Sequence, residues 1–209
     1  MTRGAGRVGG VACAAFALAA AGRVGAAGDP AACLAAAARA QVGVTVSYDP
    51  AYRRIPYPDG DLPADRGVCT DVLVRAYRKL GVDLQALVHE DMAAAWDAYP
   101  KAWGLSRPDP NIDHRRVPNL VAFFARHGEA LPVARSLSEY RAGEIVTWRL
   151  PSGVPHIGIL SDRASPSGWP LVIHNIGRGV REEDVLAAFP VTGRYRYLPP
   201  SLPACDASR

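Results

Sequence analysis

The sequence predicts an α+β fold, in which helices from the first half of the chain pack on an antiparallel sheet from the second half. Two observations predict this class. Segments with helical spacing of apolar residues come first, and short extended segments separated by glycines follow them. Helices and strands are thus segregated along the chain rather than alternating, which disfavours a βαβ arrangement. A length of 209 residues suits one domain with a core of ordinary size.

Residues 1–27 have the pattern of an export signal. Two arginines come first, an alanine-rich apolar run spans residues 8–21, and the small residues 25–27 form a cleavage site. The apolar run is too short for a stable membrane span, and no other long apolar segment follows. The sequence therefore predicts a periplasmic or secreted protein whose mature part, residues 28–209, is a single domain without an integral membrane segment.

The charge of the chain does not favour a nucleic-acid partner. The formal net charge is +4, and residues 1–27 contribute three arginines and no acidic residue, so their removal leaves +1. No run of lysine or arginine interleaved with aromatic residues occurs. We therefore expect no nucleic-acid partner.

Three cysteines remain after removal of the leader: Cys33, Cys69 and Cys205. In an oxidising compartment an odd number usually means one pair and one free thiol. Cys33 and Cys205 lie near the two ends of the mature chain, and chain ends are often close together. We predict that these two cysteines form a disulfide and leave Cys69 free. The alternative is a pair of unpaired terminal cysteines.

Four segments of the first half have a helical pattern, and residues at their ends support it. Asp29 and Asp83 are expected N-caps, and Gly81 and Gly128 are stop signals. The predicted helices span residues 29–41, 69–80, 84–99 and 117–127.

Extended segments are predicted on both sides of the helices. Residues 42–48 contain β-branched residues in a short run. Residues 49–68 hold four prolines and two glycines, and so form a long loop of the kind that is often functional. The predicted strands of the second half span residues 145–148, 156–160, 171–174 and 195–197.

Cys69 follows the long loop directly and stands in the first turn of a helix. There the unpaired backbone N–H groups and the positive end of the helix dipole favour a thiolate over a thiol. A small buried core residue is the alternative interpretation. Cysteine hydrolysis also needs an imidazole and a polar group that orients it. His156 begins a predicted strand and His174 ends the next one, so a hairpin would place both on one sheet.

The order of these segments carries a resemblance to a known family. GVCTDV, HIGIL and VIHN resemble the NlpC-type cell-wall peptidases of the papain-like cysteine hydrolase superfamily. The longer signature resembles a bacterial exported family of unassigned function placed in that superfamily, and it covers about residues 42–197. The matching segments are TVSYDPAY, YPDGDLPADRGVCTDVLVRAYRKLGVDLQ, NIDHRRVPNL, GEIVTW, HIGI and HNIG. The resemblance implies a papain-like, NlpC-like fold.

The resemblance also implies roles for single residues. Cys69 would be the nucleophile, His156 the general base and then acid, and His174 the orienting group. Successive strand residues face opposite sides, so only one of His174 and Asn175 faces His156. Asn175 is the alternative third member, and the match to the family's position favours His174. Tyr48 would assist the oxyanion, as a tyrosine does in some relatives. This chain has Val-Cys-Thr-Asp at the position where the commonest pattern of the NlpC-type family is Asp-Cys-Ser-Gly.

Other polar residues have two interpretations each. Residues 111–116 form either a substrate-binding loop, in which Arg115 or Arg116 binds a carboxylate, or an Asp–Arg network that includes Asp113 and braces the loop. Asp71 is either a capping residue or a contact for a cationic substrate group. No histidine or cysteine pair has metal-ligand spacing, so we expect no metal and no cofactor.

The sequence thus predicts an exported cysteine hydrolase, an amidase or endopeptidase that acts on peptidoglycan peptides through a Cys69–His156–His174 triad. An acyltransferase, or a thioester or ester hydrolase, would use the same triad. A non-catalytic periplasmic binding protein that retains the fold is the third hypothesis.

Overall fold

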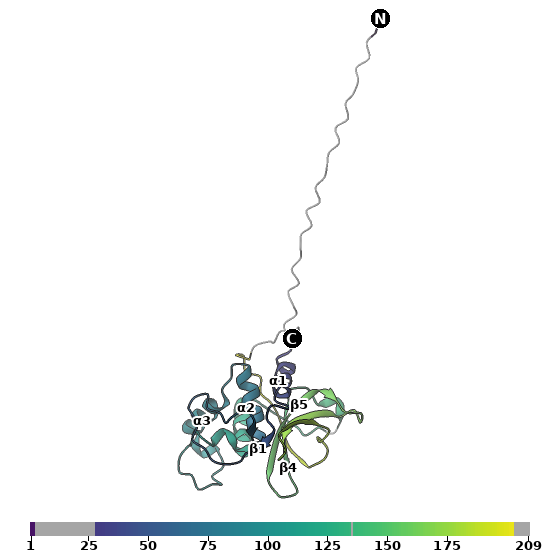
Figure 1. Cartoon of the computed structure of the whole chain (residues 1–209). Helices are drawn as coiled ribbons and strands as arrows, with labels where there is room; N and C mark the ends of the chain where they lie inside the picture. Colours follow the sequence, from purple (N-terminus) through teal and green to yellow (C-terminus); the bar gives the residue numbers. More distant parts are fainter. Residues whose placement is uncertain (3–27, 135, 203–209) are drawn as a thin grey trace.

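The computed structural model describes residues 1–2, 28–134 and 136–202 (Figure 1). Helices of the first half lie on one side, and the strands of the second half form a sheet beside them. The predicted α+β class is therefore confirmed. The predicted export signal lies outside the described residues and stays a prediction. Within the described ranges, no helix is long and apolar enough to cross a membrane.

The four predicted helices are all present. Asp29 and Asp83 act as N-caps: their side chains accept hydrogen bonds from the N–H groups of Ala31 (3.1 Å) and Gln85 (3.0 Å). The second helix is the central one and buries its residues on most of its circumference. The helices are α1 (Pro30–Arg39), α2 (Cys69–Lys79), α3 (Leu84–Ala94) and α4 (Val117–His127).

The predicted strand over residues 42–48 is wrong for most of its length. The chain after α1 forms a turn, in which the Thr45 N–H group bonds the Gln41 carbonyl at 3.0 Å. Only Ser47–Tyr48 is extended, as β1, and it pairs in parallel with β2 (Arg66–Gly67). Turn hydrogen bonds thus override the β-branched preference of this segment.

The predicted helix over residues 84–99 is also too long. α3 ends at Ala94, because Ala95 has φ −136° and ψ 47°, outside the helical region. Residues Trp96–Ala98 then form a separate short 3₁₀ helix. The direction of the chain therefore changes before Pro100 is reached.

A six-stranded antiparallel sheet forms the second layer, with the strand order β3-β8-β4-β5-β6-β7. The sequence predicted four of these strands and missed β3 and β7. Both are short edge strands with few buried residues, so they lack a hydrophobic period. The strands are β3 (Glu129–Leu131), β4 (Ile145–Arg149), β5 (Pro155–Ala164), β6 (Pro170–Asn175), β7 (Val180–Glu183) and β8 (Val191–Arg196).

The two faces of the sheet pack against different partners. One face contributes isoleucines to the core around α2 and α4: Ile145, Ile157, Ile159 and Ile173. The opposite face has its own smaller cluster of apolar residues, which includes Val146, Trp148, Leu160 and Val172. Strand alternation places His156 and His174 with this second set.

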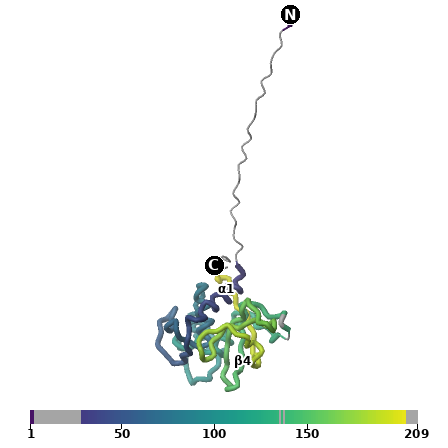
Figure 2. Tube along the Cα trace, turned by 45° about the vertical axis from the view of Figure 1, so that its right-hand side comes forward, coloured from purple at the N-terminus to yellow at the C-terminus, as the bar shows by residue number. Residues whose placement is uncertain are grey.

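The first helix and the last residues of the segment 136–202 lie at the same end of the domain. Figure 2 shows α1 and the last described residues, in yellow, next to each other. Cys33 is buried in α1. Its predicted partner, Cys205, lies outside the described residues, so the disulfide stays a prediction.

Candidate active site

Cys69 is the first residue of α2, and the loop before it is held in place by Asp71. The N–H group of Val68, the N-cap residue, donates to Oδ2 of Asp71 at 2.7 Å. This contact corresponds to the capping interpretation of Asp71. The Cys69 sulfur accepts a hydrogen bond from the backbone N–H of Ile157. The nucleophile candidate therefore lies against the start of β5, beside the residue that follows His156.

The expected thiolate is not the resting form of Cys69. The residue is 5 % exposed, and burial raises the pKa of its thiol to about 12. The N–H groups of Ile157 and Thr70 lower the pKa, as expected at a helix start, whereas Asp71 raises it. The loss of hydration outweighs the contribution of the helix start. Cys69 is therefore a neutral thiol at neutral pH, which corrects the expectation from sequence.

His156 and His174 are directly hydrogen-bonded to each other, and His174 is in turn hydrogen-bonded to the carboxylate of Glu183. Nε2 of His156 lies 2.8 Å from Nδ1 of His174, and Nε2 of His174 lies 3.2 Å from Oε2 of Glu183 on β7. Burial and the neighbouring His174 lower the pKa of His156 to about 3. Burial also lowers the pKa of His174, although Glu183 raises it. Both imidazoles are neutral at neutral pH.

These contacts fix which ring nitrogen carries each proton. The Glu183 carboxylate only accepts, so His174 donates through Nε2 and keeps a lone pair on Nδ1. His156 then donates its Nε2 proton to that lone pair. Within this series of hydrogen-bonded side chains, the free lone pair is therefore on Nδ1 of His156. Sequence reasoning missed Glu183, because nothing in the local pattern of β7 pairs it with His174.

Gly158 and Trp148 set the position of the two rings. A Cβ at Gly158 would lie 3.2 Å from Cβ of His174 and 2.7 Å from a methyl group of Val172, so only glycine leaves room for both. The Trp148 ring stacks on His156, with centroids 5.7 Å apart. Gly158, the glycine of the HIGI segment, thus leaves the space that the His174 side chain needs.

Asn175 faces the other side of the sheet from the histidines. Its Nδ2 donates to the carbonyls of Gly67 (3.0 Å) and Ser47 (3.3 Å). Asn175 therefore ties β6 to the β1–β2 pair next to the site. The structure brings His174, rather than Asn175, into contact with His156.

Tyr48, the last residue of β1, contacts the thiol. Its hydroxyl interacts with the Cys69 thiol, and both side chains line the same cavity. Burial raises the pKa of Tyr48 to about 12, with further contributions from Cys69 and Asp71. The hydroxyl therefore keeps its proton and is a donor at neutral pH.

Arg115 is buried, and its donors are used within the protein. It pairs with Asp71 (Nε to Oδ1, 3.1 Å) and donates to the carbonyls of Asp49 (2.9 Å) and Ala51 (3.1 Å). Asp113, which is also buried, accepts from the backbone N–H of residue 109 at 2.6 Å. These contacts correspond to the bracing network that was the alternative to a substrate-binding loop.

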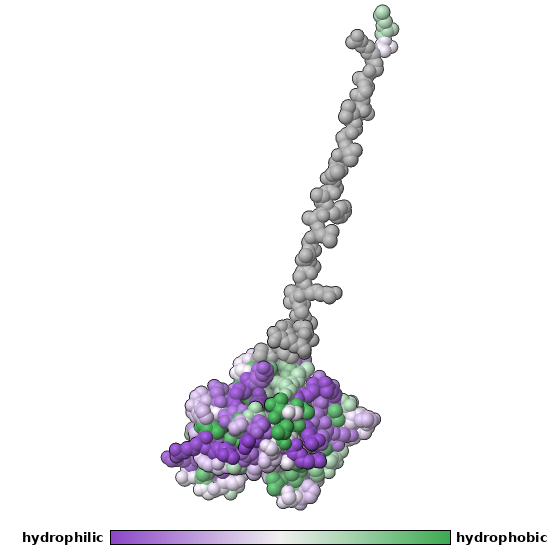
Figure 3. All heavy atoms as spheres, in the orientation of Figure 1, coloured by the Kyte–Doolittle hydropathy of each residue, from purple (hydrophilic) through white to green (hydrophobic). Residues whose placement is uncertain are grey.

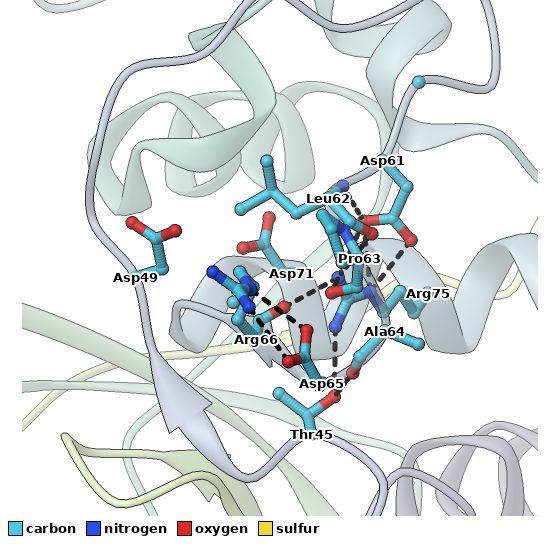
Figure 4. A network of polar contacts seen from close by, with 12 residues as sticks. Thr45, Asp49, Asp61, Leu62, Pro63, Ala64, Asp65, Arg66, Asp71 and Arg75 are labelled. Carbon is cyan, nitrogen blue, oxygen red and sulfur yellow. Dashed lines mark hydrogen bonds and ion pairs between the residues drawn. The ribbon is translucent and has the colours of Figure 1, made fainter.

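A second arginine organises the loop before Cys69, and sequence reasoning missed it. Arg75 lies one turn beyond Asp71 on α2. Its guanidinium contacts the Asp61 carboxylate (2.8 Å), the Thr45 hydroxyl (3.0 Å) and the Arg66 carbonyl (2.9 Å) (Figure 4). The only local signal for this role is an arginine among the buried residues of the helix.

Two cavities meet at the site. One of about 340 Å³ opens on Cys69, and one of about 220 Å³ opens on His156. Tyr48, Val154 and Pro155 line both, so together the cavities form a cleft that passes the thiol and the imidazole. In the view of Figure 3, apolar residues, in green, lie near the centre of the domain, with hydrophilic residues, in purple, on both sides.

Fold and site together define an α+β domain in which a buried thiol at a helix start lies against the first residues of the strand that begins with Pro155 and His156. The chain belongs to the family described as domain of unknown function DUF1287, whose model matches residues 35–197. It is 56 % identical over 159 residues to "Uncharacterized protein YijF" of Escherichia coli (strain K12). That alignment covers 76 % of this chain and 78 % of the relative.

The comparison with solved structures finds similarity to NlpC1 and NlpC2 from Trichomonas vaginalis. The identities are 15 % and 17 %, and the TM-scores are 0.45 and 0.44. Each comparison covers 84 % of this chain. The chain spans about half the length of these two proteins, 46 % and 48 %.

Proposed function

We propose that the protein is a cysteine hydrolase that cleaves an amide bond with Cys69, His156 and His174. The observation that carries this proposal is the hydrogen-bonded chain from Glu183 through His174 to His156. This hydrogen-bonded series leaves a free lone pair on Nδ1 of His156. The Cys69 sulfur accepts a hydrogen bond from the backbone N–H of Ile157, the residue that follows His156. A thiol, a neutral base and a group that orients the base are the parts that nucleophilic catalysis requires.

In the first half of the reaction, the Cys69 sulfur attacks the substrate carbonyl carbon while Nδ1 of His156 takes the thiol proton. Because both groups start neutral, proton transfer accompanies the attack. The C–N bond then breaks, and His156 gives that proton to the leaving amine. The acyl group remains on sulfur as a thioester.

In the second half, water attacks the thioester carbon and gives a proton to His156. The C–S bond breaks, and the proton returns to the sulfur of Cys69. One water is consumed, and one acid and one amine are released. His174 and Glu183 hold the tautomer of His156 throughout and are positioning residues.

Two donors are available for the developing oxyanion. The backbone N–H of Cys69 is the first of α2 and so has no acceptor within the helix. The Tyr48 hydroxyl, which contacts the sulfur, is the second donor. Removing one such donor typically lowers kcat by about 10²–10³-fold. In the proposed reaction the Tyr48 hydroxyl, which lies beside the sulfur at rest, donates to the oxyanion in the transition state.

We propose peptides of peptidoglycan as the substrate and an exported location for the enzyme. The export-signal pattern of residues 1–27 and the NlpC-type order of the GVCTDV, HIGIL and VIHN segments support both. The acyl-transfer and thioester or ester hydrolysis alternatives use the same steps with another acceptor or leaving group.

The decisive experiment incubates the protein without residues 1–27, and its Cys69→Ala variant, with purified peptidoglycan. Mass spectrometry of the soluble fraction should detect fragments that only the Cys69 protein releases, and their masses identify the bond. Fragments released equally by both proteins would contradict the role of Cys69. An inactive protein on this substrate, with turnover of a model thioester, would support the second enzymatic alternative.

A further inference from the structure

A third cavity, of about 550 Å³, lies outside the cleft that holds Cys69 and His156. Residues of the long loop and of the segment 105–111 line it, together with His89 from α3. None of its lining residues lines either of the two cavities that form the cleft. This third cavity is therefore a separate site, and the proposed reaction makes no use of it.

Two arginines line this third cavity from separate loops, and the protein does not neutralise either of them. Arg54 belongs to the long loop before Cys69, and Arg107 belongs to the segment between α3 and α4. Within the described part of the chain, neither side chain has a hydrogen bond or an ion pair. Arg53, the neighbour of Arg54, pairs by contrast with Asp49 at 3.0 Å. The cavity thus collects two positive charges without an internal counter-ion.

Asp109 is the acidic residue among those that line the third cavity, and its carboxylate is occupied by other donors. Oδ1 accepts from the backbone N–H (2.9 Å) and the side-chain amide (2.7 Å) of Asn111, and Oδ2 accepts from the Tyr52 hydroxyl (3.0 Å). Burial raises the pKa of Asp109, but these hydrogen bonds and the charge of Arg116 hold it below its ordinary value. Both oxygens are thus engaged, and the guanidinium groups of the two lining arginines remain available to a ligand.

His89 adds a polar group whose position is fixed. Its Nδ1 lies 3.3 Å from the buried carboxylate of Asp113, and the Tyr57 ring packs edge-on against it with centroids 5.1 Å apart. Because a carboxylate only accepts, Nδ1 carries a proton and Nε2 is the ring nitrogen left for a ligand.

The backbone that carries the two arginines is held together across the third cavity. The Ile55 N–H, next to Arg54, donates to Oδ1 of Asn111 at 3.0 Å, and the Tyr52 hydroxyl bridges to Asp109. These contacts join the long loop to the segment that contains Arg107. A ligand therefore has to order the arginine side chains only, and binding avoids the larger entropic cost of ordering a loop.

We infer that the third cavity binds the phosphate group of a small phosphomonoester through Arg54 and Arg107. One guanidinium fork satisfies the two oxygens of a carboxylate, whereas a terminal phosphate has three acceptor oxygens and can be bound from two sides. Its charge of nearly −2 at neutral pH matches two arginines. The volume of about 550 Å³ is larger than a phosphate group needs, so the esterified part of a small molecule fits as well.

The test is calorimetric titration of the protein without residues 1–27, in phosphate-free buffer, with glycerol 3-phosphate as the probe. Glycerate, which has a carboxylate in place of the phosphate, should bind at least about tenfold more weakly. Inorganic phosphate and a glycerophosphodiester are titrated in parallel. Inorganic phosphate should bind at the same site, and the diester, with one charge and two free oxygens, should bind more weakly than the monoester.

Single substitutions locate the contact. Arg54→Gln and Arg107→Gln should each raise the Kd for glycerol 3-phosphate about tenfold or more, because each removes hydrogen bonds to a charged group. Arg53→Gln is the matched control: it removes the same charge from the adjacent residue, which does not line this cavity, and should keep the wild-type Kd. Both lining arginines are exposed, so melting temperatures in the absence of ligand should be unchanged.

Each outcome decides for or against the phosphate site. Binding that persists in the Arg54→Gln/Arg107→Gln double variant, or a loss of equal size in Arg53→Gln, would show general attraction to positive charge and overturn the inference. No binding of either phosphate probe at millimolar concentration would overturn it as well. Equal Kd values for the monoester and the diester, or for glycerate, would contradict the assignment to a phosphomonoester. Cys69→Ala should bind with the wild-type Kd, so the result does not depend on the proposed function.

Discussion

The helical side of the cleft holds Cys69 with buried charges, whereas the sheet side holds His156 with rings and close backbone packing. On the helical side, Asp71 pairs with Arg115, and Arg75 pairs with Asp61 in the loop before Cys69. On the sheet side, His156 is fixed by Trp148, His174 and the space at Gly158. A buried charge that loses its partner costs far more than a lost ring contact. Substitutions on the helical side should therefore change stability first, and those at the histidines should change catalysis first.

The largest expected effect is on catalysis, at His156. His156→Gln removes the base and should lower kcat/KM by about 10³-fold or more, with little change in melting temperature. His127→Gln, at an exposed histidine away from the cleft, is the control and should be fully active. If His156→Gln unfolds the protein, the contrast between the two sides of the cleft is lost.

The next effect is on stability, at Arg115. Arg115→Met leaves the Asp71 carboxylate buried without its cation, and should lower the free energy of unfolding by about 3–5 kcal/mol. Denaturant titration measures this change. Arg66→Met breaks an exposed pair with Asp65 and should leave the free energy of unfolding nearly unchanged. Adding Asp71→Asn to Arg115→Met should recover part of the loss, and an additive result would contradict the pairing.

Gly158→Ala sharpens the comparison, because it tests packing rather than charge. The added methyl group meets Val172 and His174, and should cost about 1–3 kcal/mol of stability. It should also displace His174 and lower kcat. Imidazole nitrogen chemical shifts report whether the hydrogen bond between His156 and His174 survives. An unchanged spectrum with normal activity would show that the sheet absorbs the methyl group.

Glu183→Gln should have a smaller effect, of about tenfold on kcat, because the amide weakens the hydrogen bond that orients His174. Glu182→Gln is a matched control at the adjacent residue, which pairs with Arg39 instead. That variant should lose stability and keep kcat. Equal kcat values for the two variants would contradict the proposed role of Glu183 in orienting His174.

The smallest expected effect is the shape of a pH profile. Because burial raises the pKa of the Cys69 thiol, its thiolate fraction should stay below that of an ordinary cysteine between about pH 6 and 9. The rate of alkylation by iodoacetamide should therefore rise continuously with pH over this range. A plateau at mildly acidic pH would instead show a thiolate–imidazolium pair at rest, as the helix-start argument alone predicts.

The fold and half of the site could be predicted from local patterns. The helix starts and the β5–β6 hairpin follow from capping residues and strand alternation, so the meeting of His156 and His174 was foreseeable. The partners of Arg75 and Arg115 were not, because Asp71 and Arg115 are 44 residues apart in sequence. The protonation of Cys69 was missed for a related reason: burial is a property of the assembled fold and not of the helix start.

The neutral thiol at rest has a consequence for chemical durability. Peroxides and other oxidants attack the thiolate, and oxidation beyond the sulfenic acid is largely irreversible. A nucleophile that stays protonated until a substrate arrives presents almost none of the vulnerable form. In the proposed reaction, burial of Cys69 would thus protect the protein from inactivation between turnovers, and His156 would have to deprotonate the thiol each time.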